Sequence, residues 1–319
     1  MKSDVRLRLF ESRTGLPCLQ RTGLRIHFFH FNMSIHAAPA LPVKAVISTI
    51  YGTLLDNGPA PADANTAWTR LWREKLQRPP RTPLAEFNRA ADLALQTEAN
   101  ILNVRGVENP APYWPAVAEQ LLPELQGLSP ESVADFLYTH AQLRRSVRLK
   151  PGADATLRAL ESREVLLGLI SNAHPHTPVE LALALHAPYA PVESFLPVAA
   201  AHGAFTGDTA ARELEIFTAP LCFWSYSHGF GKPNLHAFQH VATRLRARRI
   251  AADEVLMVGC DDLNDLQPAR RFGWRTWHIT ADAPAQPGAG SWADLAGSLG
   301  LSIPSHETTI SKKKSTCTS

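Results

Sequence analysis

Residues 43–56 read VKAVISTIYGTLLD, and they decide how the rest of the chain is interpreted. Five apolar residues between Val43 and Ile50 form a short run rich in β-branched side chains, which Tyr51-Gly52-Thr53 then breaks. Such a run predicts a buried parallel strand that ends in a tight loop. Gly52 lets the backbone turn sharply and bring amide N–H groups close to a small ligand. Because ligands of open α/β sheets bind at the carboxyl ends of strands, this loop is a candidate binding site, and an ordinary core strand with a glycine turn is the alternative.

The second half of the chain alternates strands with helices. Strands are predicted at 165–170, 221–224, 254–258 and 274–279, with helices at 234–249 and 292–299. Strands separated by helices predict a parallel sheet covered on both faces. The fold class is therefore α/β with a Rossmann-like parallel sheet. Residues 190–214 fit no simple unit and are expected to form an irregular insertion.

Helical periodicity dominates the stretch between the first two predicted strands. Trp68, Leu71, Trp72 and Leu76 fall on one helix face, and a second apolar face begins at Leu84. Further helices are predicted over 113–125, where two prolines interrupt the pattern, and from a Ser-Pro-Glu start at 129. We interpret 57–148 as a helical cap inserted into a core made of 41–56 and 149–300, and a helical bundle without an active-site role is the alternative.

Length and composition are typical of a globular protein of about two domains. The chain has 319 residues, of which 45% are hydrophobic and 19% charged. The formal charge of +3 comes from the ends, since 1–33 hold six Lys or Arg against two acids and 301–319 hold three Lys against one Glu. A basic balance confined to two tails is not the footprint of a nucleic-acid-binding protein, so we expect no nucleic-acid partner.

The two ends are expected to lie outside the fold. Residues 1–40 are interpreted as a disordered or non-native extension, and 301–319 as a disordered Ser/Thr/Lys-rich tail. The apolar stretch 26–31 is too short to span a bilayer, so no membrane partner is expected. The four cysteines have no metal or disulfide spacing, which favours reduced thiols in a cytoplasmic protein.

Polar residues follow three of the later strands or turns. Ser171 and Asn172 follow the strand 165–170, where a hydroxyl and an amide can donate to an oxyanion, although a helix cap would use the same residue types. Lys232 lies in a turn fixed by glycine and proline, and a lysine beside an anion site can neutralise the anion and a nearby carboxylate. A surface lysine is the alternative.

A cluster of acids follows the strand 254–258. Asp261, Asp262 and Asp265 fall within five positions of a VGCDDLND stretch. Carboxylates this close together are costly unless they are solvated or paired with a cation, and oxygen ligands of this kind suit Mg²⁺. The alternative is a solvated acidic turn.

Taken in order, these four stretches resemble the four motifs of the haloacid dehalogenase superfamily of hydrolases. The tetrapeptide 51–54 resembles the dehalogenase-like form of the first motif, 169–172 the second, 231–233 the third and 259–265 the fourth. The resemblance covers roughly 43–299. It implies strand order 5-4-1-2-3, a mobile cap, a small-molecule substrate that is phosphorylated or halogenated, and Mg²⁺ as cofactor.

The resemblance also assigns roles to individual residues. It implies that Thr49, Tyr51, Lys232 and Asp265 are catalytic. It further implies that Gly52, Thr53, Ser171 and Asn172 bind the substrate and that Asp261 binds the metal ion. The fourth motif admits two alignments, because its aspartate position is Asp261 in a shorter form and Cys260 in a longer one.

Thr49 stands where the family has its nucleophilic aspartate. A threonine hydroxyl is a poor nucleophile without an adjacent base, and a phosphothreonine ester would turn over slowly. Loss of this carboxylate also predicts weak Mg²⁺ binding. Three hypotheses follow: a hydrolase whose activity is weak or altered, a non-catalytic protein that binds phosphate or a phospho-metabolite, and hydrolysis by water activated at Asp261 or Asp265. Tyr51 favours dehalogenase chemistry and Asp261 favours phosphatase chemistry; we favour a phosphate-ester ligand because the acidic corner is kept. The sequence does not decide the chemistry or the oligomeric state.

Overall fold

The structure is a computed structural model that describes residues 42–186, 214–280 and 286–304. These residues belong to one compact unit, 41–319. The predictions for 1–40, for 190–213 and for the tail from 305 lie outside the described residues. Within the described part of the chain, no helix is long and apolar enough to cross a membrane.

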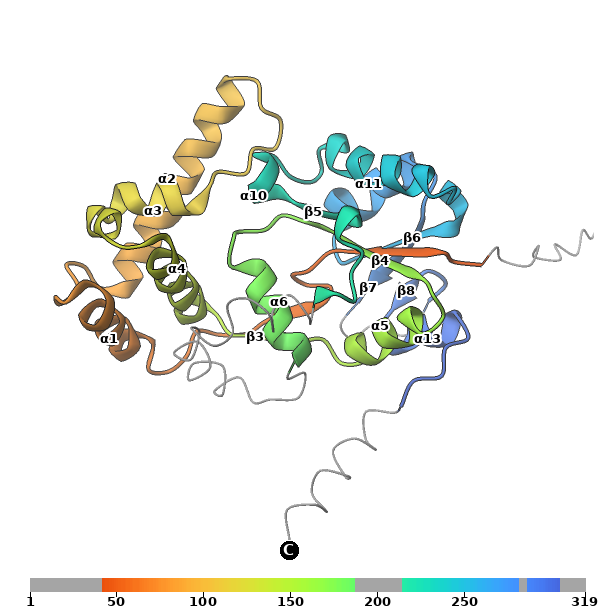
Figure 1. Ribbon diagram of the computed structural model, residues 1–319, viewed down its shortest axis with the longest axis horizontal. Helices are drawn as coiled ribbons and strands as arrows, with labels where there is room; N and C mark the ends of the chain where they lie inside the picture. The colour runs from red at the N-terminus through yellow and green to blue at the C-terminus, as the bar shows by residue number, and fades with distance from the viewer. Residues whose placement is uncertain (1–41, 187–213, 281–285, 305–319) are drawn as a thin grey trace, which may run out of the picture. The chain divides into compact units, whose positions relative to one another are not determined.

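The centre of the fold is a parallel sheet with strand order β5-β4-β1-β6-β7-β8 (Figure 1). Each neighbouring pair is parallel, and β1 lies between β4 and β6 with Ser48 opposite Leu169 and Val258. The strands are β1 (Ala45–Ser48), β4 (Leu166–Ser171), β5 (Cys222–Trp224), β6 (Val255–Gly259), β7 (Arg275–Ile279) and β8 (Ala289–Gly290). The predicted α/β class is confirmed. When only the strands of this sheet are numbered along the chain, β1, β4, β5, β6 and β7 become strands 1 to 5. The order from β7 to β5 is then the predicted 5-4-1-2-3, and β8 adds a strand beyond β7.

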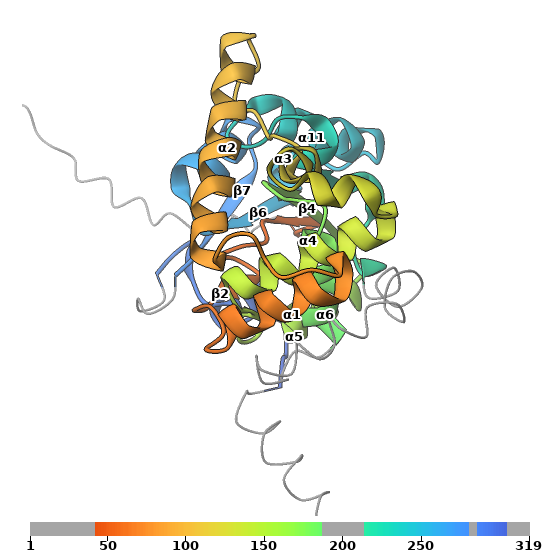
Figure 2. The ribbon, with the colours of Figure 1, turned by 90° about the vertical axis from the view of Figure 1, so that its left-hand side faces the viewer.

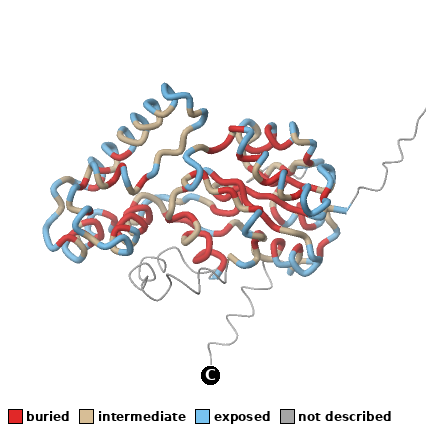
Figure 3. The backbone as a smooth tube through the Cα atoms, turned by 45° about the horizontal axis from the view of Figure 1, so that its top comes forward, coloured by how far each residue is buried: buried red, intermediate tan, exposed pale blue. Residues whose placement is uncertain are grey.

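Alternate side chains of the strands enter two separate hydrophobic cores. Val46 of β1 packs with the helices α5 (Ala153–Glu161), α6 (Thr177–His186) and α13 (Trp292–Ser298), whereas Ala45 and Ile47 pack with α11 (Leu235–Ala247) and α12 (Gln267–Arg271). Figure 3 shows the strands as the buried centre of this layer. A strand buried on both faces needs the continuous apolar pattern that the sequence has at 45–47.

A two-stranded antiparallel ribbon, β2 (Leu55–Asn57) with β3 (Val147–Leu149), connects the sheet region to a group of helices. The helices of this group face the viewer in Figure 2. Their buried residues form one hydrophobic cluster made only of residues between Ala64 and Leu143. The elements are α1 (Ala64–Leu76), α2 (Leu84–Val104), α3 (Trp114–Leu121), η1 (Pro123–Gly127) and α4 (Pro130–Arg144). These helices are inserted between β2 and β3, and we call the group the cap; its role as a cap over an active site and the bounds 57–148 stay predictions.

Most predicted elements occur within one or two residues of their expected bounds. One expected helix, 113–125, is divided because Pro123 starts the separate 3-10 helix η1. The remaining short elements are η3 (Ala219–Leu221), α10 (Ser225–His228), η4 (Ala252–Glu254) and the π-helical η5 (Asp262–Leu266). The carboxyl ends of β1, β4 and β6 therefore carry the loops whose residues were singled out from the sequence.

Candidate active site

Thr49 follows the last residue of β1 and is almost completely buried. Its side chain is 2% exposed, and its hydroxyl donates to the Thr53 hydroxyl across 2.6 Å. The turn between them is tight, as predicted, with Gly52 at a positive φ of 76°. Inside this turn the Gly52 amide donates to Leu55 and the Thr53 amide donates to Ile50. Both amides, which were expected to face a ligand, therefore stabilise the turn itself.

The loop after β6 packs directly against this turn. A Cβ atom on Gly52 would lie 2.5 Å from Cys260 Sγ, so only glycine fits there. The Cys260 thiol lies 3.5 Å from the Tyr51 carbonyl oxygen, to which it donates. Cys260 is thus the side chain of the β6 loop that faces the turn after β1.

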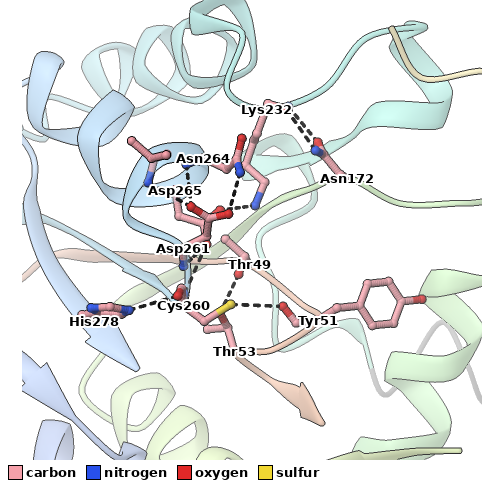
Figure 4. A network of polar contacts seen from close by, with 11 residues as sticks. Thr49, Tyr51, Thr53, Asn172, Lys232, Cys260, Asp261, Asn264, Asp265 and His278 are labelled. Atoms are coloured by element: carbon pink, nitrogen blue, oxygen red, sulfur yellow. Dashed lines mark hydrogen bonds and ion pairs between the residues drawn. The ribbon is translucent and has the colours of Figure 1, made fainter. Parts of the chain in front are cut away.

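Tyr51 points away from the group formed by Thr49, Lys232 and Asp265, as Figure 4 shows. Its hydroxyl donates to Glu180 on α6 and lies 2.9 Å from the Thr177 hydroxyl. Burial, and then the charge of Glu180, raise the pKa of Tyr51 well above its usual value. The Tyr51 hydroxyl is thus bonded to residues of α6, and the catalytic role of Tyr51 stays a prediction.

Glu180 forms a buried polar cluster that the sequence analysis did not include. Its carboxylate accepts hydrogen bonds from Gln142 at 2.7 Å and from Arg145 at 3.1 Å, and the Arg145 guanidinium lies 4.6 Å from the Tyr51 ring centroid. Burial raises the pKa of Glu180, although Arg145 opposes the shift. The signal in the sequence was a single acid inside an apolar helix, TPVELALALH. Such a carboxylate needs buried partners.

Lys232 and Asp265 form an ion pair that is almost fully shielded from solvent, with side chains 8% and 3% exposed. The other oxygen of Asp265 accepts the backbone N–H groups of Cys260 at 3.2 Å and Asp261 at 3.1 Å. Asp265 thus fixes the loop after β6 and the end of the lysine side chain at the same time. The sequence predicted both residues for the site, and the structure brings them together.

Asn172 holds the backbone of Lys232 in place. Its side-chain amide donates to the Lys232 carbonyl at 3.0 Å, and its oxygen accepts the Lys232 N–H at 2.7 Å. Asn172 does not cap a helix, because α6 begins only at Thr177. Ser171 is the last residue of β4, the neighbour of β1, and is 3% exposed. Ser171 and Thr49 therefore end adjacent parallel strands, as expected.

The cap contacts the segment that leads to Lys232. The Gly231 N–H donates to the Asn109 carbonyl at 2.8 Å, and the Ala111 N–H donates to the Gly229 carbonyl at 2.9 Å. A Cβ atom on Gly231 would lie 2.2 Å from the Asn172 side-chain oxygen. The segment 229–232 is consequently held between a cap loop and the end of β4.

Asp261 serves its own turn. Its carboxylate accepts the N–H groups of Leu263 at 2.9 Å and Asn264 at 3.0 Å, together with the Asn264 side-chain amide. These bonds, that of the Asn264 amide first, lower the pKa of Asp261. The Asp261 carboxylate therefore caps the start of η5, whereas the Cys260 side chain faces the turn after β1.

Sequence comparison decides the family. The model of the haloacid dehalogenase-like hydrolase family matches residues 43–273, well over half of the chain. The chain belongs to this family. No curated protein matches the sequence.

Solved structures of the family are similar to this chain at low identity. The 2-haloacid dehalogenase from Pseudomonas syringae pv. Tomato DC3000 has 20% identity and a TM-score of 0.47, with 81% of this chain and 98% of that chain covered. The putative HAD-hydrolase YfnB from Bacillus subtilis bound to magnesium has 17% identity and a TM-score of 0.44, covering 82% and 100%. The HAD phosphatase from Thermococcus onnurineus has 15% identity and a TM-score of 0.41, covering 82% and 100%.

The residues of this haloacid dehalogenase-like chain do not fit a strong Mg²⁺ site. Mg²⁺ requires oxygen ligands and one or two free carboxylates. Thr49 offers a hydroxyl that is bound to Thr53, Cys260 offers a thiol, and the carboxylate of Asp265 is paired with Lys232. Within the described ranges, no group of three or more His, Cys, Asp or Glu side chains could hold a metal ion. The metal-binding role of Asp261 stays a prediction that its three local hydrogen bonds do not favour.

Proposed function

We propose that this member of the hydrolase family binds a small phosphorylated metabolite at the ends of β1 and β4, and that it hydrolyses the bound ligand very slowly. The observation that carries the proposal is the environment of Thr49. The residue that follows β1 has a buried hydroxyl whose hydrogen-bond partner is the hydroxyl of Thr53. Attack by a hydroxyl requires a base within hydrogen-bond reach, and another hydroxyl is not one.

The fate of a covalent product supports the same conclusion. Members of the family attack with aspartate, and water cleaves the reactive acyl phosphate or ester that results. Phosphorylation of Thr49 would form an alkyl phosphate ester, which lacks this reactivity. A slow or dead-end reaction therefore follows from the residue type as well as from its surroundings.

Direct activation of water by Asp265 or Asp261 finds no support in the geometry. A general base needs a free lone pair directed at the water. Asp265 binds Lys232 and two backbone amides, and Asp261 accepts three hydrogen bonds in its own turn. Both carboxylates thus stabilise the loop after β6.

Binding, in contrast, needs only donors, and these are present. The Lys232 ammonium has three N–H groups and uses one on Asp265, so others remain for an anion. The Ser171 hydroxyl ends the strand next to Thr49. A hydroxyl at the carboxyl end of a parallel strand, together with a lysine whose backbone is bound by Asn172 after that strand, suits a phosphate group or a carboxylate. A halogenated carboxylic acid is the second ligand class, and the dehalogenase-like YGTL sequence at 51–54 favours it.

The proposal is tested by measuring binding and turnover separately. Titration calorimetry with inorganic phosphate and phenyl phosphate should give binding, with affinity reduced about tenfold by Ser171→Ala, because one hydrogen bond to a charged group is lost. Ser162→Ala, at an exposed serine on α5's carboxyl end, is the matched control. Phosphate release from phenyl phosphate, followed by NMR, should stay near the uncatalysed rate. Rapid release, or equal affinity in wild type and Ser171→Ala, contradicts the proposal.

A further inference from the structure

The cap and the start of α6 line a groove of about 830 Å³. Its walls come from α3, η1 and α4 of the cap and from the segment 175–179 before and within α6. Thr49, Ser171 and Lys232 do not line it. The volume falls within the range of small-molecule sites, roughly 300–1,000 Å³. The groove is therefore not part of the proposed anion site.

Aromatic side chains form part of its wall. Tyr113, Trp114 and Tyr138 line the groove, and Tyr113 is 51% exposed although it is a large, mainly apolar residue. The faces of tyrosine and tryptophan rings carry negative electrostatic potential and attract cations. An exposed aromatic residue at the edge of a groove provides such a face to a ligand.

The charges of the groove have the same sign as the ring faces. Three carboxylates line it, those of Glu119, Glu131 and Asp135, against one ammonium group, that of Lys75. Lys75 is already paired with Asp135. The two remaining carboxylates leave the described lining with a net negative charge. An anion would be repelled there, and a cation would be attracted.

Two polar atoms in the wall have no hydrogen-bond partner among the residues that the structure describes. Asp135 Oδ1 and His176 Nε2 are buried without a hydrogen bond, and His176 is only 8% exposed. Burial lowers the pKa of His176 to about 3, so the imidazole is neutral and adds no positive charge to the groove. A carboxylate oxygen left without a donor adds to the negative potential of a wall with low dielectric constant.

We propose that this groove binds a small organic cation with an apolar body, such as an aryl or alkyl ammonium compound. The aromatic side chains would contact the apolar body and the ammonium group of the ligand, while Glu119 and Glu131 would neutralise the positive charge of the ligand. The proposal is independent of the phosphate site, because the two share no lining residue. It concerns binding only and includes no chemical step.

The test uses three probes of similar size and different charge. Titration calorimetry at low ionic strength compares benzyltrimethylammonium, benzyl alcohol and benzoate. The cation is expected to bind to one site, at least about tenfold more tightly than the alcohol, and benzoate is expected not to bind. Tyr113→Ala should weaken the binding of the cation severalfold. Equal binding of the cation and the alcohol would overturn the proposal.

A charge-matched pair of variants separates the groove from the general charge of the protein. Glu119→Gln with Glu131→Gln should lower the affinity for benzyltrimethylammonium about tenfold, whereas Glu86→Gln with Glu161→Gln, at exposed sites outside the groove, should leave it unchanged. Equal losses in the two double variants would contradict the assignment. Phosphate affinity should be the same in the two double variants and in the wild type, so failure of the anion site would be recognised separately.

Discussion

Lys232 and Asp265 form a buried ion pair that joins the segment before α11 to the loop after β6 (Figure 4). Because Asn172 binds the backbone of Lys232 and Asp265 binds two amides after β6, the pair connects the ends of β4 and β6 across the position of Thr49. The two charged residues are therefore held in place by hydrogen bonds from a neighbouring side chain and from the backbone. This arrangement preserves the site although the residue after β1 is a threonine.

Breaking this pair on one side should destabilise the protein strongly. Lys232→Met leaves the Asp265 carboxylate buried with its backbone donors alone, and we expect a loss of about 3–5 kcal/mol in the free energy of unfolding. Lys232→Met combined with Asp265→Leu should recover part of this loss, because no unpaired charge remains. Urea denaturation of the wild type, both single variants and the double variant measures the coupling. Additive losses in the double variant would show that the two charges do not depend on each other.

Gly231→Ala should disturb the lysine without touching its side chain. The added methyl group would lie 2.2 Å from the Asn172 oxygen that accepts the Lys232 N–H, so the segment must shift. We expect a loss of about 1–3 kcal/mol in unfolding free energy and weaker phosphate binding. Gly297→Ala is the control, since a Cβ atom there meets nothing within 4 Å. Unchanged phosphate affinity in a folded Gly231→Ala protein would show that the hydrogen bonds from Asn172 to Lys232 are not needed for phosphate binding.

The strands and the four loops could be predicted from the sequence because apolar runs and glycine positions are local signals. The 43–56 stretch forms the expected strand and turn, and Lys232 and Asp265, both expected in the site, form an ion pair with each other. The pairing of Asn172 with the backbone of Lys232 could not be read, because it joins positions 60 residues apart. The same holds for Tyr51, whose hydroxyl was expected at the site and instead binds Glu180, 129 residues away. A pattern of residue types shows that a buried carboxylate needs partners, and only the packing shows which ones.

The position of Tyr51 changes what a substitution there should do. Tyr51→Asp, which the family pattern suggests as a route to phosphatase chemistry, would place a second carboxylate beside the buried Glu180. We expect it to destabilise the protein by roughly 3 kcal/mol or more, whereas Tyr51→Phe, which removes only the hydroxyl, should cost about 1–2 kcal/mol. Thermal and urea unfolding of both variants measures the difference. A Tyr51→Asp protein as stable as Tyr51→Phe would show that the aspartate turns away from Glu180.

Acid should destabilise the cap through His140. This histidine is 1% exposed, with Nε2 2.8 Å from the Asn88 side-chain oxygen, and burial first, then Arg144, lower its pKa to about 3. Between pH 6.5 and about 3 the unfolded chain binds a proton that the folded chain excludes, so the free energy of unfolding falls as the pH is lowered. The slope from this one group approaches about 1.4 kcal/mol per pH unit. His140→Leu should reduce the slope, and an identical pH profile in wild type and variant would contradict the assignment.

We propose that Thr49 is the residue that does most to separate a ligand-binding site from a hydrolytic one. Thr49→Asp should increase hydrolysis more than any other single substitution, because in the proposed site Ser171 and Lys232 position the anion and an aspartate would form an acyl phosphate that water can cleave. Cys260 faces the same turn, so Cys260→Asp would add the second carboxylate that a divalent cation needs. Thr49→Asp with Cys260→Asp is therefore the strongest variant.

The most direct measurement is the steady-state release of p-nitrophenol from p-nitrophenyl phosphate in the presence of Mg²⁺. Wild type, Cys260→Asp, Thr49→Asp and the double variant are compared after circular dichroism has shown that each is folded. The account predicts a background rate for the wild type and for Cys260→Asp, a clear increase for Thr49→Asp, and the highest rate, at least about 100-fold above wild type, for the double variant. A wild type that turns over as fast as the double variant, or a folded double variant that binds phosphate and remains inert, would contradict it.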